Sequence, residues 1–444
     1  MNFTTDNLIV VIDLGSSRIS GVVGRKDYND RVEIIASESM TSKGIKRGAI
    51  CNLESAAFCI KNILSLLQNK VNILFNEGRS DEEKKTYEIC GVYVGLNGQT
   101  IKTMDSRVPR NLGEVEVTRE IIDTLYRENH NIKIENGEIL EIVTQEYMVD
   151  DSDEVSPVGC ICTRIEGRYK IIAGRPSLKS NLHKCFEKAG YEIIGTFLSP
   201  IATASAVLSK EEKELGCVMI DFGAGTTSVA IYYKNVLRHI GVIPFGSDVI
   251  TKDIMDLKVL EVVAEKLKIK YGSAMEELVE DFYISTPAIS GKEGKTVSNK
   301  FLAGIIEART EEILNYVCDQ MEKSGLTCHL DEIVITGGGS KLQNLTEKLK
   351  LRTGLDVRIG IPNQKVALDM DEKYLKVENA QLIGLLIHAE MVCMKEKAAV
   401  PDLDAAGAEK DKFAKNKKSN KQKKGLLGSL FDTINDIFTE DSKI

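Results

Sequence analysis

The sequence predicts an α/β protein made of two similar lobes. Two segments far apart in the chain, VIDLGSSRISGVV (11–23) and MIDFGAGTTSVAI (219–231), repeat one pattern. In each, an apolar strand ends at an Asp, a glycine and small hydroxyl residues make a turn, and a second apolar strand begins. A third segment, IVITGGGSKLQNLTEKL (333–349), adds an apolar strand followed by three glycines and a predicted helix. The duplication indicates two similar lobes that face each other.

The composition is that of an ordinary globular protein. The chain has 444 residues, of which 43% are hydrophobic and 28% charged, so it is long enough for two or more packed units. Its net charge of -8 argues against general nucleic-acid binding. The ten cysteines are scattered, which predicts reduced thiols. The N-terminus lacks a secretory signal pattern and no apolar run is long enough to span a bilayer, so we expect a cytoplasmic protein.

The remaining elements are placed by periodicity and by turn residues. Alternating or β-branched apolar runs predict strands, and apolar residues at spacings of three and four predict amphipathic helices. A polar segment at 78–86 is typical of a surface loop. We expect strands at 8–14, 18–27, 31–39, 87–96, 169–174, 217–221 and 332–336, helices at 52–67, 118–129 and 178–189, and a helix-rich region over 248–327.

The repeated turn suits a phosphate chain with a metal ion. Glycines allow backbone N–H groups to approach phosphate oxygens, and Ser or Thr hydroxyls add donors. A carboxylate at the strand end would hold Mg²⁺ through water, because Mg²⁺ needs only one or two carboxylates. An ordinary hairpin turn is the alternative for either copy alone, but two copies favour phosphate binding. The candidates are Asp13, Gly15, Ser16 and Ser17 in the first copy and Asp221, Gly223, Gly225, Thr226 and Thr227 in the second, with Asp13 and Asp221 as metal ligands.

The glycines of the third segment predict a further nucleotide contact. A glycine turn between a strand and the N-terminus of a helix lets the backbone lie flat against a base or a phosphate. We expect Gly337, Gly338, Gly339 and Ser340 to form this contact, with a helix that begins near Ser340. Three glycines alone are a weak signal, but these follow both phosphate loops and would close the site.

The three motifs, in this order, resemble those of the superfamily of actin, the heat-shock chaperone ATPases and the sugar kinases. Within that superfamily the chain is most similar to the bacterial cell division family FtsA, over residues 8–438. Three segments carry this resemblance: SKGIKRGAICNLESA (42–56), VTQEYMVDD (143–151) and LRHIGVIPFGSDVITKDI (237–254). It implies an actin-like two-lobed ATPase fold with an inserted α+β subdomain, called 1C.

The same resemblance implies a division of the chain into subdomains. After about residue 394 the sequence becomes polar and rich in Lys and Ala, and such a composition cannot bury enough apolar surface to fold. The implied parts are 1A (1–86 and 169–200), 1C (87–168), 2A (201–247), 2B (248–327), 2A with a return to 1A (328–394), a disordered basic linker (395–424) and a membrane-targeting amphipathic helix (425–439).

By this resemblance the chain binds ATP with Mg²⁺. Glu265 and Lys268 match positions that contact the ribose and the base, although a solvated charged helix face is the alternative. The related chaperones carry a carboxylate that helps to position the attacking water, and Ser199 stands at that place here. Without the carboxylate, the orientation of water in phosphoryl transfer is poorly supported. We therefore expect weak or negligible ATPase activity and a mainly structural role, and we assign no catalytic residue.

The end of the chain predicts attachment to a membrane surface. Between Lys412 and Lys424 there are seven lysines and no acid, which would attract an anionic leaflet. The segment GLLGSLFDTINDIF (425–438) forms an apolar stripe on a helix too short to span, so it would lie in the interface plane. Docking on the protein's own body or on a partner is the alternative. The stripe comprises Leu426, Leu427, Leu430, Phe431, Ile434, Ile437 and Phe438.

The resemblance implies a cell division protein that works at the division site, on the cytoplasmic face of the membrane. It would tether filaments of the tubulin-like GTPase FtsZ through 2B, self-associate into filaments, and recruit later division proteins to the septal ring through 1C. An anionic membrane surface is the other expected partner, and nucleic acid is not. Two alternatives stay open: a pilus-assembly scaffold similar to PilM, and an active phosphotransferase or ATPase of the same superfamily.

Overall fold

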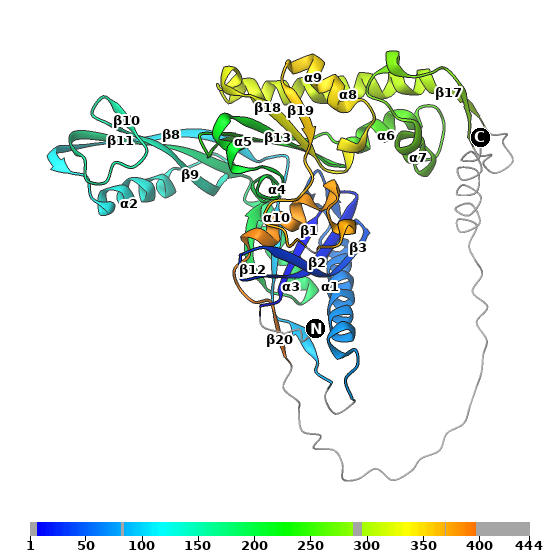
Figure 1. Cartoon of the computed structure of the whole chain (residues 1–444), viewed down its shortest axis with the longest axis horizontal. Helices are drawn as coiled ribbons and strands as arrows, with labels where there is room; N and C mark the ends of the chain where they lie inside the picture. The colour runs from blue at the N-terminus through cyan, green and yellow to red at the C-terminus, as the bar shows by residue number, and fades with distance from the viewer. Residues whose placement is uncertain (1–6, 81–83, 287–294, 369, 397–444) are drawn as a thin grey trace, which may run out of the picture.

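The computed structural model describes residues 7–80, 84–286, 295–368 and 370–396. The membrane-targeting helix predicted at 425–439, and nearly all of the linker predicted before it, lie outside the described residues. Figure 1 shows a first lobe below, a second lobe above it, and an elongated insertion that extends to one side. Among the described residues, we find no helix that is both long and apolar enough to cross a membrane. The predicted two-lobed α/β architecture is confirmed.

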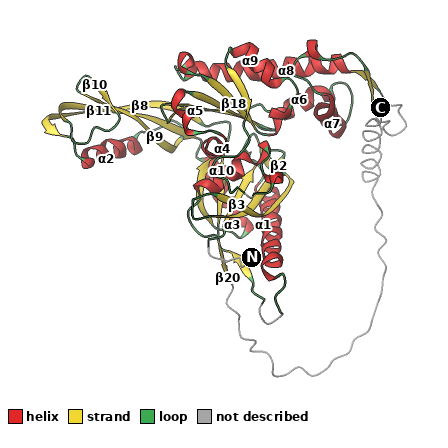
Figure 2. Cartoon of the chain, viewed as in Figure 1, coloured by secondary structure: helices red, strands yellow, loops and turns green. Residues whose placement is uncertain are grey.

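A five-stranded sheet forms the core of the first lobe (Figure 2). Its strands are β1 (Ile9–Leu14), β2 (Arg18–Lys26), β3 (Val32–Thr41), β7 (Val92–Leu96) and β12 (Ile193–Leu198), and its helices are α1 (Leu53–Asn76), α3 (Ser177–Ala189), α4 (Ser199–Val207) and α10 (Ala380–His388). The strand order is β12-β7-β1-β2-β3, with β1 antiparallel to β2 and parallel to β7. The two glycines of β2 show which helix covers each face: a side chain on Gly21 would meet Leu67 of α1, and a side chain on Gly24 would meet Leu386 of α10. The two helices therefore cover opposite faces of the sheet.

The second lobe repeats this arrangement. Its strands are β13 (Cys217–Phe222), β14 (Thr227–Tyr233), β15 (Val236–Ile243), β18 (Glu332–Thr336) and β19 (Asp356–Ile359), and its helices are α6 (Ser247–Met255), α7 (Glu261–Tyr271), α8 (Asn299–Lys323) and α9 (Leu345–Thr353). β13 is antiparallel to β14 and parallel to β18, as β1 is to β2 and β7. Asp221 lies opposite Ser228, as Asp13 lies opposite Ser20. The sequence repeat thus corresponds to a repeated strand arrangement.

The insertion has its own small core and an antiparallel sheet. It contains β8 (Lys102–Glu116), α2 (Arg119–Glu128), β9 (Glu138–Val149), β10 (Ser152–Glu154) and β11 (Ile161–Gly174). Its sheet joins that of the second lobe where Lys102 pairs with Gly241, and Thr103 Oγ1 donates to Ile240 O at 2.9 Å. The inserted strands therefore run from Lys102 to Gly174, which differs from the limits expected at 87–168.

The single strand predicted at 87–96 is wrong. It divides into β6 (Tyr87–Ile89) and β7, which belong to different sheets. The backbone leaves the strand direction at Cys90, where its N–H donates to Cys393 O at 2.8 Å. β7 then enters the core of the first lobe, so it is not part of the insertion. The minor elements are β4 (Ile45–Lys46), β5 (Ala49–Ile50), α5 (Lys210–Leu215), β16 (Tyr283–Ser285), β17 (Thr296–Ser298) and β20 (Met394–Glu396).

The predicted helices form, with small differences at their ends. α1 begins after Asn52, whose side chain accepts a hydrogen bond from Ser55 N at 3.0 Å, and it continues beyond the expected residue 67 to Asn76. α3 ends at Gly190, which has the left-handed φ of 85° that favours glycine. α2 begins after Thr118, close to its predicted start.

Helices α4 and α10 pack tightly against each other at the junction of the lobes. α10 has the apolar sequence AQLIGLLI, and α4 also contacts β13 and β14 of the second lobe. The two helices approach so closely that a Cβ on Gly384 would lie 1.8 Å from Ala202 O. This contact therefore holds the floor of the cleft between the lobes.

We predict that Gly384→Ala destabilises the protein, because the backbone of α4 would have to move. Overpacking of this kind typically costs about 1–3 kcal/mol. Urea denaturation would measure the free energy of unfolding. The matched control is Gly304→Ala in α8, where the new Cβ would meet only the end of the flexible Glu276 side chain. Equal stability of the two variants would contradict the close packing of α4 and α10.

Candidate functional site

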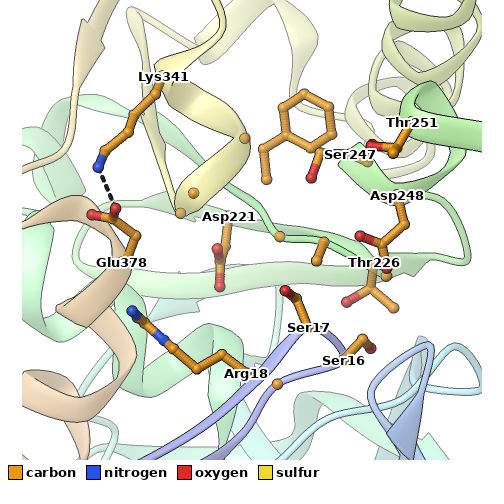
Figure 3. Close-up of a pocket in the computed structure, with 18 of the residues that line it drawn as sticks. Ser16, Ser17, Arg18, Asp221, Thr226, Ser247, Asp248, Thr251, Lys341 and Glu378 are labelled. Atoms are coloured by element: carbon orange, nitrogen blue, oxygen red, sulfur yellow. Dashed lines mark hydrogen bonds and ion pairs between the residues drawn. The ribbon is translucent and has the colours of Figure 1, made fainter. Parts of the chain in front are cut away.

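A cavity of about 900 Å³ lies between the two lobes. Both Asp-containing hairpins line it, together with α6 and α7 on one side and the glycine turn and α10 on the other. Figure 3 shows Asp221 of one hairpin across from Ser17 and Arg18 of the other. Segments far apart in the sequence therefore meet in one site.

The structure brings most of the predicted site residues together. The residues that line the cavity are Asp13, Gly15, Ser16, Ser17, Asp221, Gly223, Gly225, Thr226, Glu265, Lys268, Gly337, Gly338 and Gly339. Two others do not line it and instead stabilise its walls: Thr227 Oγ1 donates to Phe245 O at 2.9 Å, and Ser340 Oγ donates to Gly337 O at 2.7 Å. The seven residues predicted to bind the membrane lie outside the described residues.

Glycines let the two hairpin turns approach each other. A Cβ on Gly225 would lie 2.4 Å from Ser16 Oγ, and one on Gly15 would lie 2.5 Å from Arg18 O. Any larger residue would therefore push the turns apart or distort them. Ser16 Oγ also accepts a hydrogen bond from Gly48 N at 3.2 Å, which fixes the first turn. The glycines in the repeated motif are thus required by the geometry of the cleft.

Two carboxylates from the two lobes share this cavity. Burial raises the pKa of Asp13 to about 7, and repulsion from Asp221 adds to the rise, whereas Arg18 and Gln381 oppose it. Burial also raises the pKa of Asp221 to about 6, against the effect of Thr203. A bound cation would relieve both effects, and Mg²⁺ requires only one or two carboxylates when phosphates supply further oxygens. Asp13 and Asp221 therefore fit the predicted magnesium site.

In the described part of the chain, no group of three or more His, Cys, Asp and Glu residues gathers as a metal cluster. A magnesium ion in the cleft would consequently depend on a bound phosphate for part of its coordination.

Glu265 and Lys268 of α7 are fixed on the wall of the cavity. Lys268 Nζ lies 2.8 Å from Glu265 Oε2 and donates to Thr251 Oγ1 at 2.8 Å and to Ser247 O at 3.1 Å. Lys268 is 8% exposed, so it is not part of a solvated helix face. The network connects α7 with α6 and holds both side chains beside the cavity.

The glycine turn differs from its prediction in one respect. The residues after Gly337 form a short 3₁₀ turn (Gly338–Lys341), and the following helix α9 begins at Leu345 rather than near Ser340. Asn344 has a left-handed φ of 58°, which prevents a continuous helix. Gly337 has φ of 82°, and a Cβ on it would lie 2.3 Å from Asp221 Oδ1. The turn therefore packs directly against the buried carboxylate.

The motifs missed several residues of the cavity. Lys341 and Glu378 form an ion pair at its edge, drawn as a dashed line in Figure 3, and Arg18 follows the first turn. Gln381 Nε2 donates to Asp13 Oδ1 at 2.8 Å. The sequence contains one indication of Gln381, because it is a polar residue within the otherwise apolar run AQLIGLLI.

The fold and the paired hairpins place the chain in the class of actin-like two-lobed proteins. A solved chain described as "PilM-PilN type IV pilus biogenesis complex" matches with a TM-score of 0.56, covering 85% of this chain and 97% of that chain. Its sequence identity is 16%, so the match shows a shared fold alone.

Sequence comparisons identify the family. The family model described as "Cell division protein FtsA" matches residues 218–384, and "SHS2 domain inserted in FTSA" matches residues 98–173. The "Cell division protein FtsA" of Neisseria meningitidis serogroup B is 32% identical over 386 residues, covering 85% of this chain and 89% of the relative. The protein of that description from Borreliella burgdorferi is 30% identical, covering 86% and 91%. The chain belongs to the FtsA family of cell division proteins, as the sequence predicted.

We predict that Asp13→Asn changes how stability depends on pH in the nucleotide-free protein. The folded state holds the Asp13 proton up to about pH 7, whereas the unfolded state releases it near 3.8. The stabilising contribution of the protonated acid is therefore present below the unfolded pKa and is lost as pH rises through the folded pKa. Each pKa unit corresponds to about 1.4 kcal/mol, so the variant should gain in relative stability between pH 4 and 7.

Chemical denaturation across this pH range would measure the difference in free energy of unfolding. Asp123→Asn on the exposed side of α2 is the matched control. Parallel pH curves for the wild type and Asp13→Asn would show that Asp13 is not held in its protonated form.

Proposed function

We propose that this member of the FtsA family is an ATP-binding adaptor that tethers FtsZ filaments to the cytoplasmic membrane. The observation that carries the proposal is the cleft in which Asp13 and Asp221 face each other on two glycine-containing hairpins. Membership of the FtsA family indicates the role in cell division. The cleft indicates that this role depends on a bound nucleotide.

The cleft supports binding of ATP with Mg²⁺. The hairpin turns would bind the phosphates, and Asp13 and Asp221 would hold the metal through water. Glu265 and Lys268 lie where they would contact the nucleoside, and Gly337 to Gly339 would contact the opposite side of it. Hydrolysis would be weak, because α4 begins with Ser199 rather than a carboxylate.

Attachment to the membrane would use the C-terminal segment 425–439. Its apolar stripe suits the interface of a bilayer, and the lysines before it would favour an anionic surface. A peripheral position on the cytoplasmic face at the division site would follow from this attachment. The sequence pattern of this segment supports the proposed anchor.

The second lobe offers a surface for FtsZ. Exposed apolar side chains gather around the small hairpin and the start of α8, where Phe301 is 60% and Tyr283 74% exposed. Leu278 and Phe282 are exposed nearby in the sequence, and Lys300 adds a positive charge. Exposed apolar side chains that cluster in this way are typical of protein interaction sites.

The far end of the insertion offers a second interaction surface. Val115, Val155, Val158 and Ile161 are exposed there, at the end of β8 and the start of β11. We expect this surface to serve self-association or the recruitment of later division proteins. The sheet that connects the insertion to the second lobe would keep this end at a fixed distance from the cleft (Figure 1).

We predict that the full chain co-sediments with anionic liposomes in the presence of ATP and carries purified FtsZ into the pellet. A chain that ends at Lys424 keeps the lysines but loses the apolar stripe. We therefore expect it to remain in the supernatant. Neutral liposomes are the control for the electrostatic contribution. If both chains pellet alike, or neither pellets, the C-terminal segment is not the anchor.

We predict that Phe301→Glu weakens FtsZ binding by about tenfold or more, as expected for an aromatic residue at the centre of an interface. Phe301 N donates to Ser298 Oγ at the start of α8, so a glutamate there would complete a capping box and should not destabilise the helix. Affinity would be measured by fluorescence anisotropy with labelled FtsZ. Phe58→Glu on α1, a similarly exposed aromatic in the first lobe, is the control. Equal losses in both variants would argue against a specific surface on the second lobe.

A further inference from the structure

The floor of the cleft contains polar groups that the nucleotide motifs do not use. Ser199 opens α4, is 1% exposed, and its Oγ has no hydrogen-bond partner among the residues that the structure describes. Gln381 reaches the same place from α10, where its Nε2 donates to Asp13 Oδ1. Both residues line the cavity. A buried hydroxyl aimed into a polar cavity is costly unless a ligand or water satisfies it.

These two side chains converge on one point beside Gly95. A Cβ on Gly95 would lie 2.8 Å from Ser199 Oγ and 2.3 Å from Gln381 Nε2. We call this position the Gly95 point. Because glycine places no side chain between them, the two polar atoms lie close enough together for one water molecule beside Gly95 to bond to both. Such a water would have the two partners that a bound water needs.

We propose that Gln381 and Ser199 are positioning residues that together hold the water that attacks the terminal phosphate of a nucleotide bound in the cleft. This inference rests on the proposed nucleotide binding and deepens it. The amide and the hydroxyl would take the place of a carboxylate, which the start of α4 lacks because Ser199 stands there. They come from two different helices, which explains why no linear motif contains them.

The proposed step is hydrolysis of the terminal phosphoryl group. The water oxygen forms a bond to the γ-phosphorus while the bond from that phosphorus to the bridging oxygen breaks. The electron pair of the broken bond stays on the β-phosphate of ADP. One water proton remains on the released phosphate, and the other passes to the solvent. Neither a neutral amide nor a serine hydroxyl is a strong base, so these residues orient the water without deprotonating it. The reaction is therefore slow but measurable.

Single-turnover hydrolysis of γ-labelled ATP by the full chain tests the proposal. Ser199→Ala and Gln381→Leu should each slow hydrolysis by at least about tenfold, since orientation of the nucleophile is lost. The double variant should be no slower than the slower single variant, because both side chains act on one water. Ser205→Ala is the control, since this hydroxyl lies on the same helix but bonds to His388 rather than lining the cavity.

A second readout separates positioning from a structural effect. The ratio of affinities for ADP with aluminium fluoride and for ADP alone reports how well the attacking water is held. This ratio should fall in both Gln381→Leu and Ser199→Ala. The affinity for ADP itself should stay within about threefold in Ser199→Ala, because the phosphate loops are intact and Asp13 keeps its hydrogen bond from Gln381. Gly95→Ala, which places a methyl group at the Gly95 point, should reproduce both losses without relying on either polar variant.

The outcomes separate this inference from the proposed function. Failure of the wild type to bind ATP would overturn both. Binding of ATP without any hydrolysis, hydrolysis by Gln381→Leu at the wild-type rate, or independent multiplying losses in the double variant would overturn the positioning role alone. The expected losses with unchanged ADP affinity would establish it.

Discussion

The burial of two facing carboxylates is the constraint on which the rest of the cleft depends. Asp13 and Asp221 each occupy the end of a central strand, and each is buried at the cost of a raised pKa. Such a pair is tolerated only where other groups offset the repulsion. Arg18 and Gln381 do so for Asp13, and a cation would do so for both. The strand register, the glycine turns and the α10 amide all meet at this pair.

The close packing of α4 and α10 determines how the two carboxylates stay in place. α10 carries Gln381 to Asp13, and α4 carries Ser199 and Thr203 beneath the cavity. Gly384 allows the two helices to touch backbone to backbone. A shift of either helix would therefore disturb the acids and the residues around them together. Gly384, the glycine of α10, accordingly lies one turn from Gln381.

Local patterns predicted the hairpins and most of the glycines of the site, because an apolar strand, an Asp and a glycine turn are all short-range features. Gln381 and Ser199 were not predicted as a pair, since they meet only after helices from distant parts of the chain pack together. The sequence predicts Thr227 as a phosphate donor and Ser340 as part of the glycine turn that contacts the nucleotide, whereas in the structure both hydroxyls bond to nearby carbonyls. The junction between the insertion and the second lobe includes the pairing of Lys102 with Gly241 and the hydrogen bond from Thr103 to Ile240, which no periodicity reveals.

The arrangement of the second lobe links the cavity to the proposed partner surface. Glu265 and Lys268 line the cavity on α7, and Lys268 bonds to α6. Arg309 Nη2 of α8 donates to Asp253 Oδ1 of α6 at 3.0 Å, and the start of α8 carries the exposed Phe301. A nucleotide that contacts α7 therefore acts on the same packed unit that presents the surface. If FtsZ and nucleotide prefer the same position of this unit, each must strengthen binding of the other by an equal factor.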